Sequence, residues 1–122
     1  STVATALMDS IANNTGDVHI VNTRNRGAIA DLPPECAVEV AAVIDGRGAT
    51  PLTQGQLPLR VRGLVQQVKA YEQLTVQAAV TGDREAAVWA LVNHPLVGSH
   101  AAAVALVDRL VDAHRDYLPA FV

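Results

Sequence analysis

Hydrophobic and polar positions follow two different periods along this chain, and the period changes near residue 58. Before that point, short apolar runs separated by Gly, Pro and Asn are typical of β-strands. After it, apolar residues recur every three or four positions, which is typical of amphipathic helices. A further helix is predicted at the start of the chain and ends at residues 13–16, where Asn and Gly tolerate left-handed backbone. Its apolar positions are Val3, Ala6, Leu7 and Ile11.

A small sheet is predicted between residues 18 and 53. Residues 18–21 (Val-His-Ile-Val) read as a short buried strand, and residues 37–44 form the strongest strand pattern in the chain. A turn at residues 45–48 lets residues 50–53 return antiparallel beside it. The positions that share one face of the strongest strand under the period of two are Val38, Val40, Ala42 and Ile44.

Three helices are predicted after the sheet. A long helix spans residues 59–81 and ends at Gly82, and Asp83 can cap a second helix that stops before Pro95. Ser99 can cap a last helix over residues 99–118. The positions expected to face inward on that last helix are Ala103, Leu106, Val107, Leu110 and Val111. The order of helix, sheet and helical half predicts an α+β fold with a small, mostly antiparallel sheet packed with helices.

Composition narrows the class of protein. A length of 122 residues suits a single domain, and half of the residues are apolar while only 3% are aromatic. The net charge of −3 argues against a nucleic-acid partner, which would require a basic face. The single cysteine rules out an internal disulfide, and no signal peptide or apolar stretch of about 20 residues is present. We therefore expect a cytoplasmic protein with no membrane partner.

The start of the chain bears on its completeness. The first predicted helix begins almost at Ser1, with no leader before it. A chain that begins within an element indicates a fragment of a longer protein, although a natural domain boundary would give the same pattern.

Nucleotide and metal sites are not evident in the sequence. The close glycine pair at residues 46–48 lacks the third glycine of a dinucleotide-binding turn and opens no helix. The four histidines are dispersed, whereas a metal site requires ligands that converge at defined spacing. We interpret His19, on an apolar strand, as a histidine of the core or of an interface.

Candidate nucleophiles and acid–base groups have plainer interpretations. Cys36 follows the acidic Glu35, which disfavours a thiolate, so it is interpreted as a small buried hydrophobe. Glu39 lies in the middle of the strongest strand and is expected to face either solvent or a partner surface. Asp108 and Asp112 share a helix face close in sequence to arginines, which indicates a solvated charged surface.

One loop has the character of a binding surface. Residues 24–27 (Arg-Asn-Arg-Gly) are polar, cationic and end in glycine, and guanidinium groups match the oxygens of an anionic group such as phosphate. An ordinary exposed loop would have the same composition. The residues alone therefore predict an α+β domain without a self-contained active site.

This loop and the strand after it carry a resemblance to a known family. Residues 21–33 (Val-Asn-Thr-Arg-Asn-Arg-Gly-Ala-Ile-Ala-Asp-Leu-Pro) resemble the Asn-x-Gly-x-Ile-x-Asn-Leu-Pro stretch of the family 4 glycoside hydrolases. Residues 36–40 are similar to the Val-Val-Glu-Val-Pro strand that follows it there. The resemblance continues in the same order through residues 48–58, 68–83, 94–97 and 113–119. Within the family, the bacterial 6-phospho-β-glucosidases are the most similar in character.

The resemblance implies a two-domain enzyme that uses NAD and Mn²⁺. In this family a sugar hydroxyl is oxidised, the glycosidic bond breaks by elimination, and the steps reverse after water adds. The family's glycine-rich loop, metal ligands and tyrosine base all lie upstream of the matched stretch. Residues 1–122 are therefore expected to form the C-terminal domain, without catalytic, cofactor or metal residues and inactive alone. Its expected partners are the absent N-terminal nucleotide-binding domain and further copies of the enzyme, with a phosphorylated or plain glycoside as substrate.

Three residues are carried over as candidates for the site. Asn25, Gly27 and Ile29 match the family loop that faces the substrate pocket. The chain departs from the pattern at Arg24, where proline is common, at Asp31, where asparagine stands, and at Ala41, where proline stands. Because Asp31 adds an anion near the expected pocket, phosphorylation of the substrate stays open.

Two other hypotheses compete with the glycosidase fragment. A free-standing interaction domain would use the helices at residues 59–81 and 99–118 as contact surfaces. The C-terminal domain of a lactate or malate dehydrogenase relative would share the architecture, but it fits the helical half poorly and the catalytic histidine signature is lacking. For the isolated chain, we expect association through apolar surface that a missing domain would otherwise cover.

Overall fold

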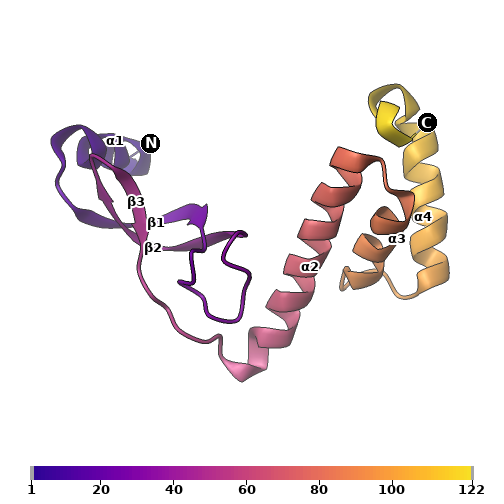
Figure 1. Ribbon diagram of the computed structural model, residues 1–122, viewed down its shortest axis with the longest axis horizontal. Coiled ribbons are helices and arrows are strands. Elements are labelled where there is room, and N and C mark those ends of the chain that lie inside the picture. Colours follow the sequence, from indigo (N-terminus) through magenta and orange to yellow (C-terminus); the bar gives the residue numbers. More distant parts are fainter. Residues whose placement is uncertain (1, 122) are drawn as a thin grey trace. The chain divides into compact units, whose positions relative to one another are not determined.

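A computed structural model describes residues 2–121 as α-helices, a three-stranded sheet and two short 3₁₀ helices. The chain divides into two compact units (Figure 1). The sheet unit extends to Pro58, and the helical unit begins at Leu59. The predicted α+β fold class is confirmed, and the boundary between the units coincides with the change of hydrophobic period near residue 58.

The sheet unit contains one helix and the sheet. These elements are α1 (Thr2–Asn13), β1 (Asp17–Arg24), β2 (Ala37–Asp45) and β3 (Gly48–Pro51). The strand order is β1-β2-β3 and both pairings are antiparallel, so β2 is the central strand. Each predicted strand is present, but the prediction that residues 18–21 form a buried strand is wrong, because Val18 and Ile20 are 57% and 68% exposed. β1 is an edge strand that extends beyond residues 18–21 at both ends, and β3 begins two residues earlier than predicted.

The core of the sheet unit lies on one face of β2. The four side chains predicted to share that face, Val38, Val40, Ala42 and Ile44, are all buried, and Glu39 between them is exposed. Each of the larger aliphatic side chains contributes roughly 1.5–3 kcal/mol through its burial. α1 packs against β2 at one end of this unit.

A polar contact joins α1 to the sheet. Ser10 is fully buried on α1, and its Oγ lies 3.1 Å from Nε2 of His19 on β1. Ser10 Oγ also donates to Asp17 Oδ2 at 3.4 Å. His19 pairs in register with the fully buried Ala42, and it is itself half-buried with its ring in contact with Ser10.

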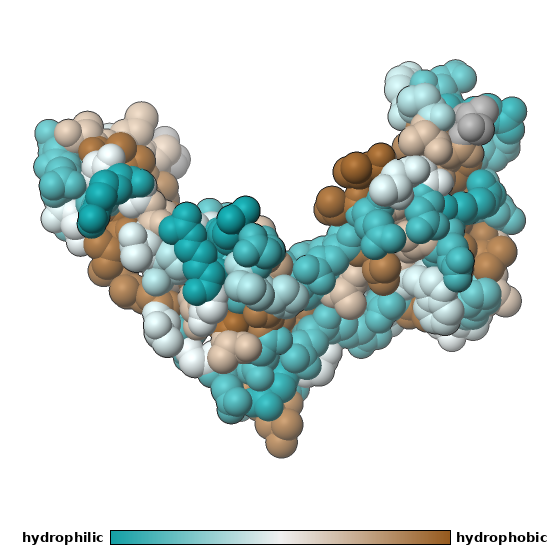
Figure 2. All heavy atoms as spheres, in the orientation of Figure 1, coloured by the Kyte–Doolittle hydropathy of each residue, from teal (hydrophilic) through white to brown (hydrophobic). Residues whose placement is uncertain are grey.

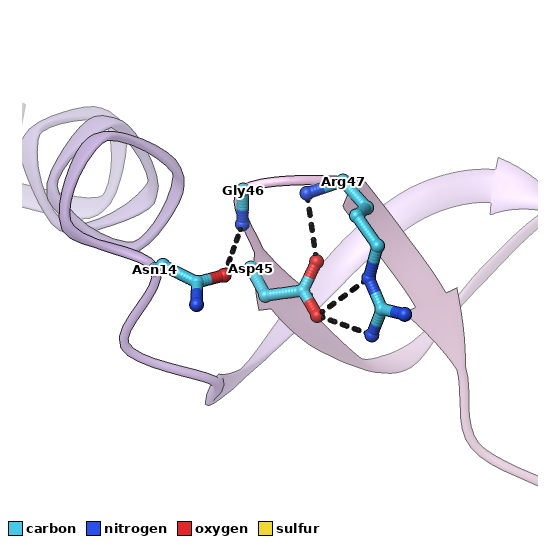
Figure 3. Close-up of polar contacts among 4 residues, drawn as sticks. All are labelled: Asn14, Asp45, Gly46 and Arg47. Atoms are coloured by element: carbon cyan, nitrogen blue, oxygen red, sulfur yellow. Dashed lines mark hydrogen bonds and ion pairs between the residues drawn. The ribbon is translucent and has the colours of Figure 1, made fainter.

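The hairpin between β2 and β3 is held by carboxylate and amide side chains (Figure 3). Asp45 Oδ1 accepts a hydrogen bond from the Arg47 amide at 2.8 Å, and Asp45 Oδ2 accepts one from Arg47 Nη2 at 2.8 Å. Asn14, just after α1, accepts from the Gly46 amide at 2.9 Å. The turn is therefore fixed both by its own side chains and by the end of α1.

The helical unit contains α2 (Leu59–Thr81), α3 (Arg84–Asn93) and α4 (His100–Ala113). Both predicted N-caps are confirmed, because Asp83 accepts from the Ala86 amide at 3.0 Å and Ser99 accepts from the Ala102 amide at 3.1 Å. Within the described residues, no helix has the length and apolar character needed to cross a membrane.

The end of the last helix differs from the prediction. α4 stops at Ala113 instead of residue 118 and is followed by 3₁₀ turns at Arg115–Tyr117 and Pro119–Phe121. The helix ends where its C-cap, His114, leaves the helical conformation with φ −115° and ψ 19°. Pro119 restricts only the residue directly before it, Leu118, which has φ −122° and ψ 57°.

Small side chains form the core of the helical unit. Its buried hydrophobic residues are Ala78, Ala86, Ala90, Ala103 and Val107. Leu106 and Leu110, which were predicted to face inward, are 37% and 47% exposed, so the apolar stripe of α4 is wider than the surface that α2 and α3 cover.

The charged face of α4 is confirmed as a set of exposed ion pairs. Arg84 on α3 reaches Asp108 at 2.5 Å, and Arg115 reaches Asp112 at 2.5 Å. Such exposed pairs contribute little to stability, typically about 0–1 kcal/mol each. The partner of Asp108 comes from another helix, a contact that spacing along α4 could not predict.

Candidate functional site

The loop between β1 and β2 is organised around a single buried side chain. Asn25 is fully buried, and its Nδ2 lies 3.0 Å from the carbonyl oxygens of Ile29 and Leu32 and 3.1 Å from that of Pro33. Its Oδ1 accepts a hydrogen bond from the Ile29 amide at 2.8 Å. An amide is the side-chain group that can donate twice and accept at the same point, so an Asp or a Leu could not replace it here.

Backbone hydrogen bonds between its two ends close the same loop. The Asn25 amide donates to the Cys36 carbonyl at 2.8 Å, and the Arg26 amide donates to the Pro34 carbonyl at 2.9 Å. Between these contacts Gly27 adopts φ +84°, a conformation that favours glycine. Cys36 is buried at the end of the loop, as predicted for a small hydrophobe.

A second segment, residues 52–58, is joined to this loop by hydrogen bonds. The Ala30 amide donates to the Gly55 carbonyl at 2.8 Å, and the Gln54 amide donates to the Ala28 carbonyl at 2.7 Å. The Leu57 amide donates to Asp31 Oδ2 at 2.6 Å. Asp31, one of the departures from the family pattern, thus joins the two segments.

These two segments and the outer face of the sheet enclose an open cleft of about 530 Å³. Ile29 projects from the loop, and Ile20 and Ala41 from β1 and β2 supply apolar walls. Glu39 contributes a carboxylate, and Gly55 lies on the side formed by the second segment. The cleft can therefore hold an apolar surface that carries hydrogen-bond donors, which is the character of small-molecule sites.

The three predicted site residues, Asn25, Gly27 and Ile29, differ in whether they reach the cleft. Ile29 lines the cleft, whereas Asn25 is buried inside the loop and positions Ile29 through hydrogen bonds in both directions. Gly27 lies on the exposed part of the loop, where an added Cβ would meet nothing within 4 Å. The sequence did not predict the role of residues 52–58. The glycine at position 55 was the available signal, and in the structure it adopts the left-handed φ of +78°.

The charged groups around the loop suit recognition more than covalent chemistry. Arg24 pairs with Glu35 at 3.3 Å, with both side chains largely exposed. Among residues 2–121, no group of three or more His, Cys, Asp or Glu could hold a metal ion. The same residues contain no glycine-rich turn between a strand and a helix, which is the feature that binds NAD in dinucleotide-binding folds.

The chain is similar to known proteins over most of its length. The model of the family 4 glycosyl hydrolase C-terminal domain matches residues 1–97. A probable 6-phospho-beta-glucosidase of Bacillus subtilis is 46% identical over 121 residues, which cover 99% of this chain and 27% of that protein.

Solved structures show the same fold. A 6-phospho-alpha-glucosidase from gut microorganisms, in complex with NAD and glucose-6-phosphate, has a TM-score of 0.86 and 29% identity over 93% of this chain and 26% of its own. The 6-phospho-beta glucosidase of Thermotoga maritima, with manganese, NAD⁺ and glucose-6-phosphate, has a TM-score of 0.84 and 32% identity over 96% of this chain and 29% of its own. The chain thus spans about a quarter of the length of these relatives. It belongs to the family 4 glycosyl hydrolases, as a member of their C-terminal domain family.

Proposed function

We propose that this chain is the C-terminal part of an enzyme that cleaves phosphorylated or plain glycosides, and that it is inactive without the rest of that enzyme. The observation that carries the proposal is the match of 99% of the chain to a quarter of a probable 6-phospho-beta-glucosidase. Two similar structures contain glucose-6-phosphate together with NAD.

The proposal assigns the cofactors to the remainder of the enzyme. The chemistry that NAD supplies in such an enzyme is transient oxidation of a substrate hydroxyl, which lets the glycosidic bond break by elimination. We assign both NAD and Mn²⁺ to a nucleotide-binding domain upstream. In support, residues 2–121 contain no group of three or more His, Cys, Asp or Glu that could hold a metal ion.

The role proposed for this chain is to form one wall of the sugar pocket. Asn25 holds the loop so that Ile29 presents an apolar side chain to the cleft, where Glu39 can accept hydrogen bonds from sugar hydroxyls. The carboxylate of Asp31 is engaged by the Leu57 amide, so its charge serves the joint between the two segments. A phosphorylated substrate is therefore compatible with Asp31, and we propose one. We also propose that the whole enzyme works in the cytoplasm.

A chimeric enzyme tests this proposal. This chain replaces the matching segment of the Bacillus subtilis relative, and the product is assayed with an aryl 6-phospho-β-glucoside, NAD and Mn²⁺. The proposal predicts turnover by the chimera and none by the isolated chain or by the relative without the segment. A chimera that folds and binds NAD but fails to turn over either phosphorylated or plain glycosides would refute the proposal.

The alternative is a free-standing interaction domain of the same fold. The exposed outer face of β1 favours it, because Val18 and Ile20 are 57% and 68% exposed. Figure 2 shows hydrophobic atoms, in brown, at the surface of the chain. In that case the chimera stays inactive, while the isolated chain binds another protein through this face.

A further inference from the structure

The turn between β2 and β3 contains the one Asp-Gly pair of the sequence, Asp45-Gly46, and the sequence has no Asn-Gly pair. Asp-Gly is the dipeptide in which aspartate isomerises most readily, because glycine has no side chain to hinder attack by its own amide nitrogen on the neighbouring carboxyl group. Asp45 ends β2 and pairs with Gly48 across the turn. The reactive pair therefore lies where the register of the hairpin is set.

The isomerisation is an internal reaction in which the water released at one step is taken up at the next. The Gly46 amide nitrogen loses its proton and attacks Cγ of Asp45, and water leaves from the neutral carboxylic acid. The product is a five-membered succinimide ring. Water then adds to either carbonyl of the ring, which returns aspartate or gives isoaspartate, in which the backbone runs through Cβ and Cγ.

The packing of α1 explains why glycine follows Asp45. A Cβ on Gly46 would lie 3.3 Å from Oδ1 of Asn14 and 3.7 Å from the carbonyl oxygen of Ile11, so a larger residue would press against the end of α1. Asn14 itself has φ +53°, a conformation that asparagine tolerates better than most residues. The close approach that favours glycine thus also places a reactive Asp-Gly pair in the turn.

The same approach restrains the attacking nitrogen. The Gly46 amide donates to Asn14 Oδ1 at 2.9 Å, and Figure 3 shows the Asn14 side chain reaching the turn from the end of α1. Attack requires that the amide nitrogen lose its proton and that its peptide plane rotate toward Cγ of Asp45. A hydrogen bond from this N–H opposes both changes, because it stabilises the protonated amide in one orientation.

The carboxyl group is restrained from the other side of the turn. Asp45 Oδ1 accepts from the Arg47 amide and Oδ2 accepts from Arg47 Nη2, both at 2.8 Å. These contacts fix the rotation of the carboxylate, and the Asp45 side chain is only 15% exposed. The hydrogen bonds from Arg47 also lower the pKa of Asp45, so that less of the neutral acid that can lose water is present.

We propose that Asp45-Gly46 is a latent isoaspartate site that its hydrogen bonds keep unreactive in the folded chain. The bond to Asn14 holds the nitrogen, and the bonds from Arg47 hold the carboxyl group. Loss of either contact frees one of the two reacting groups. The inference does not depend on the proposed function, because its readout is covalent structure and not activity.

Isoaspartate at this position would change the hairpin and the segment after it. The modification lengthens the backbone of the turn by one carbon atom, so Gly48 could no longer pair with Asp45 and β3 would lose its register. β3 leads into residues 52–58, several of which line the cleft. The modification would therefore disturb the candidate site without altering any residue that lines it.

The test follows isoaspartate at residue 45 in the purified 122-residue chain during incubation at physiological temperature. Peptide mapping with the protease Asp-N measures it, because this enzyme cleaves before aspartate and not before isoaspartate. The folded chain should isomerise more slowly than the chain unfolded in urea. Asn14→Ala and Arg47→Ala, shown to be folded by circular dichroism, should each react about two- to twelvefold faster than the unmodified folded chain, the factor expected for one lost hydrogen bond. In urea all three chains should react at similar rates, because the Asp-Gly pair is the same in each.

Two matched controls separate the contacts from general loosening of the unit. Asn14→Asp keeps an oxygen acceptor at the same position, and Asn22→Ala removes an exposed asparagine at the other end of the sheet, so both should keep the slow rate. Because the Arg47 side chain is 90% exposed, its removal leaves the fold intact, and Arg47→Ala alone is a sufficient test. A folded unmodified chain that isomerises as fast as the unfolded one, or a folded Arg47→Ala chain that reacts at the unmodified rate, would overturn the proposal.

Discussion

At the scale of single residues, buried hydrogen bonds contribute more to the stability of the loop between β1 and β2 than exposed charges do. Asn25 is the clearest case, because one side chain holds the carbonyls of Ile29, Leu32 and Pro33 and the amide of Ile29. Burial makes each of these groups costly to leave unpaired. The exposed pair of Arg24 and Glu35 on the same loop contributes far less.

Asn25→Ala should destabilise the sheet unit by about 1–3 kcal/mol, because carbonyl and amide groups inside the loop lose their partner. The helical unit contains the single tryptophan, Trp89, so fluorescence does not report on this loop. Hydrogen exchange of the Ile29 amide is the suitable measurement and should become faster.

The matched control for this prediction is Asn22→Ala, an exposed asparagine on β1 of the same unit. It should change stability by no more than about 0.5 kcal/mol. Equal exchange rates of the Ile29 amide in the two variants would mean that Asn25 does not hold the loop.

Gly82 is the other residue whose identity is fixed by its surroundings. It adopts φ +74°, and a Cβ there would lie 1.8 Å from the carbonyl oxygen of Ala120 in the last 3₁₀ turn. Gly82→Ala should therefore displace Pro119–Phe121 in addition to the cost of about 1–2 kcal/mol for left-handed backbone. Urea denaturation followed by Trp89 fluorescence measures the loss.

Truncation after Leu118 separates the two contributions to the Gly82 effect. If the clash with Ala120 is real, Gly82→Ala should cost less in the truncated chain than in the full one, so the two changes are less than additive. Strict additivity would show that the last turn does not pack on Gly82.

At the scale of elements, the turn between β2 and β3 shows how side chains fix a hairpin. The hydrogen bonds from the Arg47 side chain, followed by that from its backbone amide, lower the pKa of Asp45 below its ordinary value. A lowered pKa in the folded state means that the contribution to stability is present above the pKa of the unfolded chain. It is lost as the pH falls through the lower folded pKa.

Arg47→Ala should raise the pKa of Asp45 toward its ordinary value, because the guanidinium donors are removed. The backbone amide of residue 47 still donates to Asp45 Oδ1, so part of the lowering should remain. Carboxyl NMR titration measures both effects, with Arg26→Ala as a control on the distant loop. An unchanged titration midpoint would contradict the role given to the guanidinium.

Local pattern predicted most of the elements, for identifiable reasons. The period of two in β2 and the caps at Asp83 and Ser99 depend on neighbouring residues alone, so the sequence displays them. The contact of Arg84 with Asp108 joins residues 24 apart, and no local pattern contains it.

The candidate site was predicted less completely than the fold. The motif around Asn25 located the loop, but the buried position of its side chain follows from carbonyls up to eight residues away. The cleft also needs residues 52–58, which reach the loop only through the path of the folded sheet.

At the scale of the whole molecule, the proposed function rests on one of the two compact units. The sheet unit holds the loop and cleft proposed to form a wall of a sugar pocket. Similar enzymes are about four times as long as this chain, so the central claim is that these units complete a larger glycosidase.

The most direct test of that claim is to sequence the natural reading frame upstream of Ser1. The account predicts an in-frame segment that encodes a glycine-rich turn after a strand, followed by a Cys-Asn-x-Pro stretch, as the family resemblance implies. A start codon immediately before the first helix, with an in-frame stop codon ahead of it, would contradict the account and leave a free-standing domain.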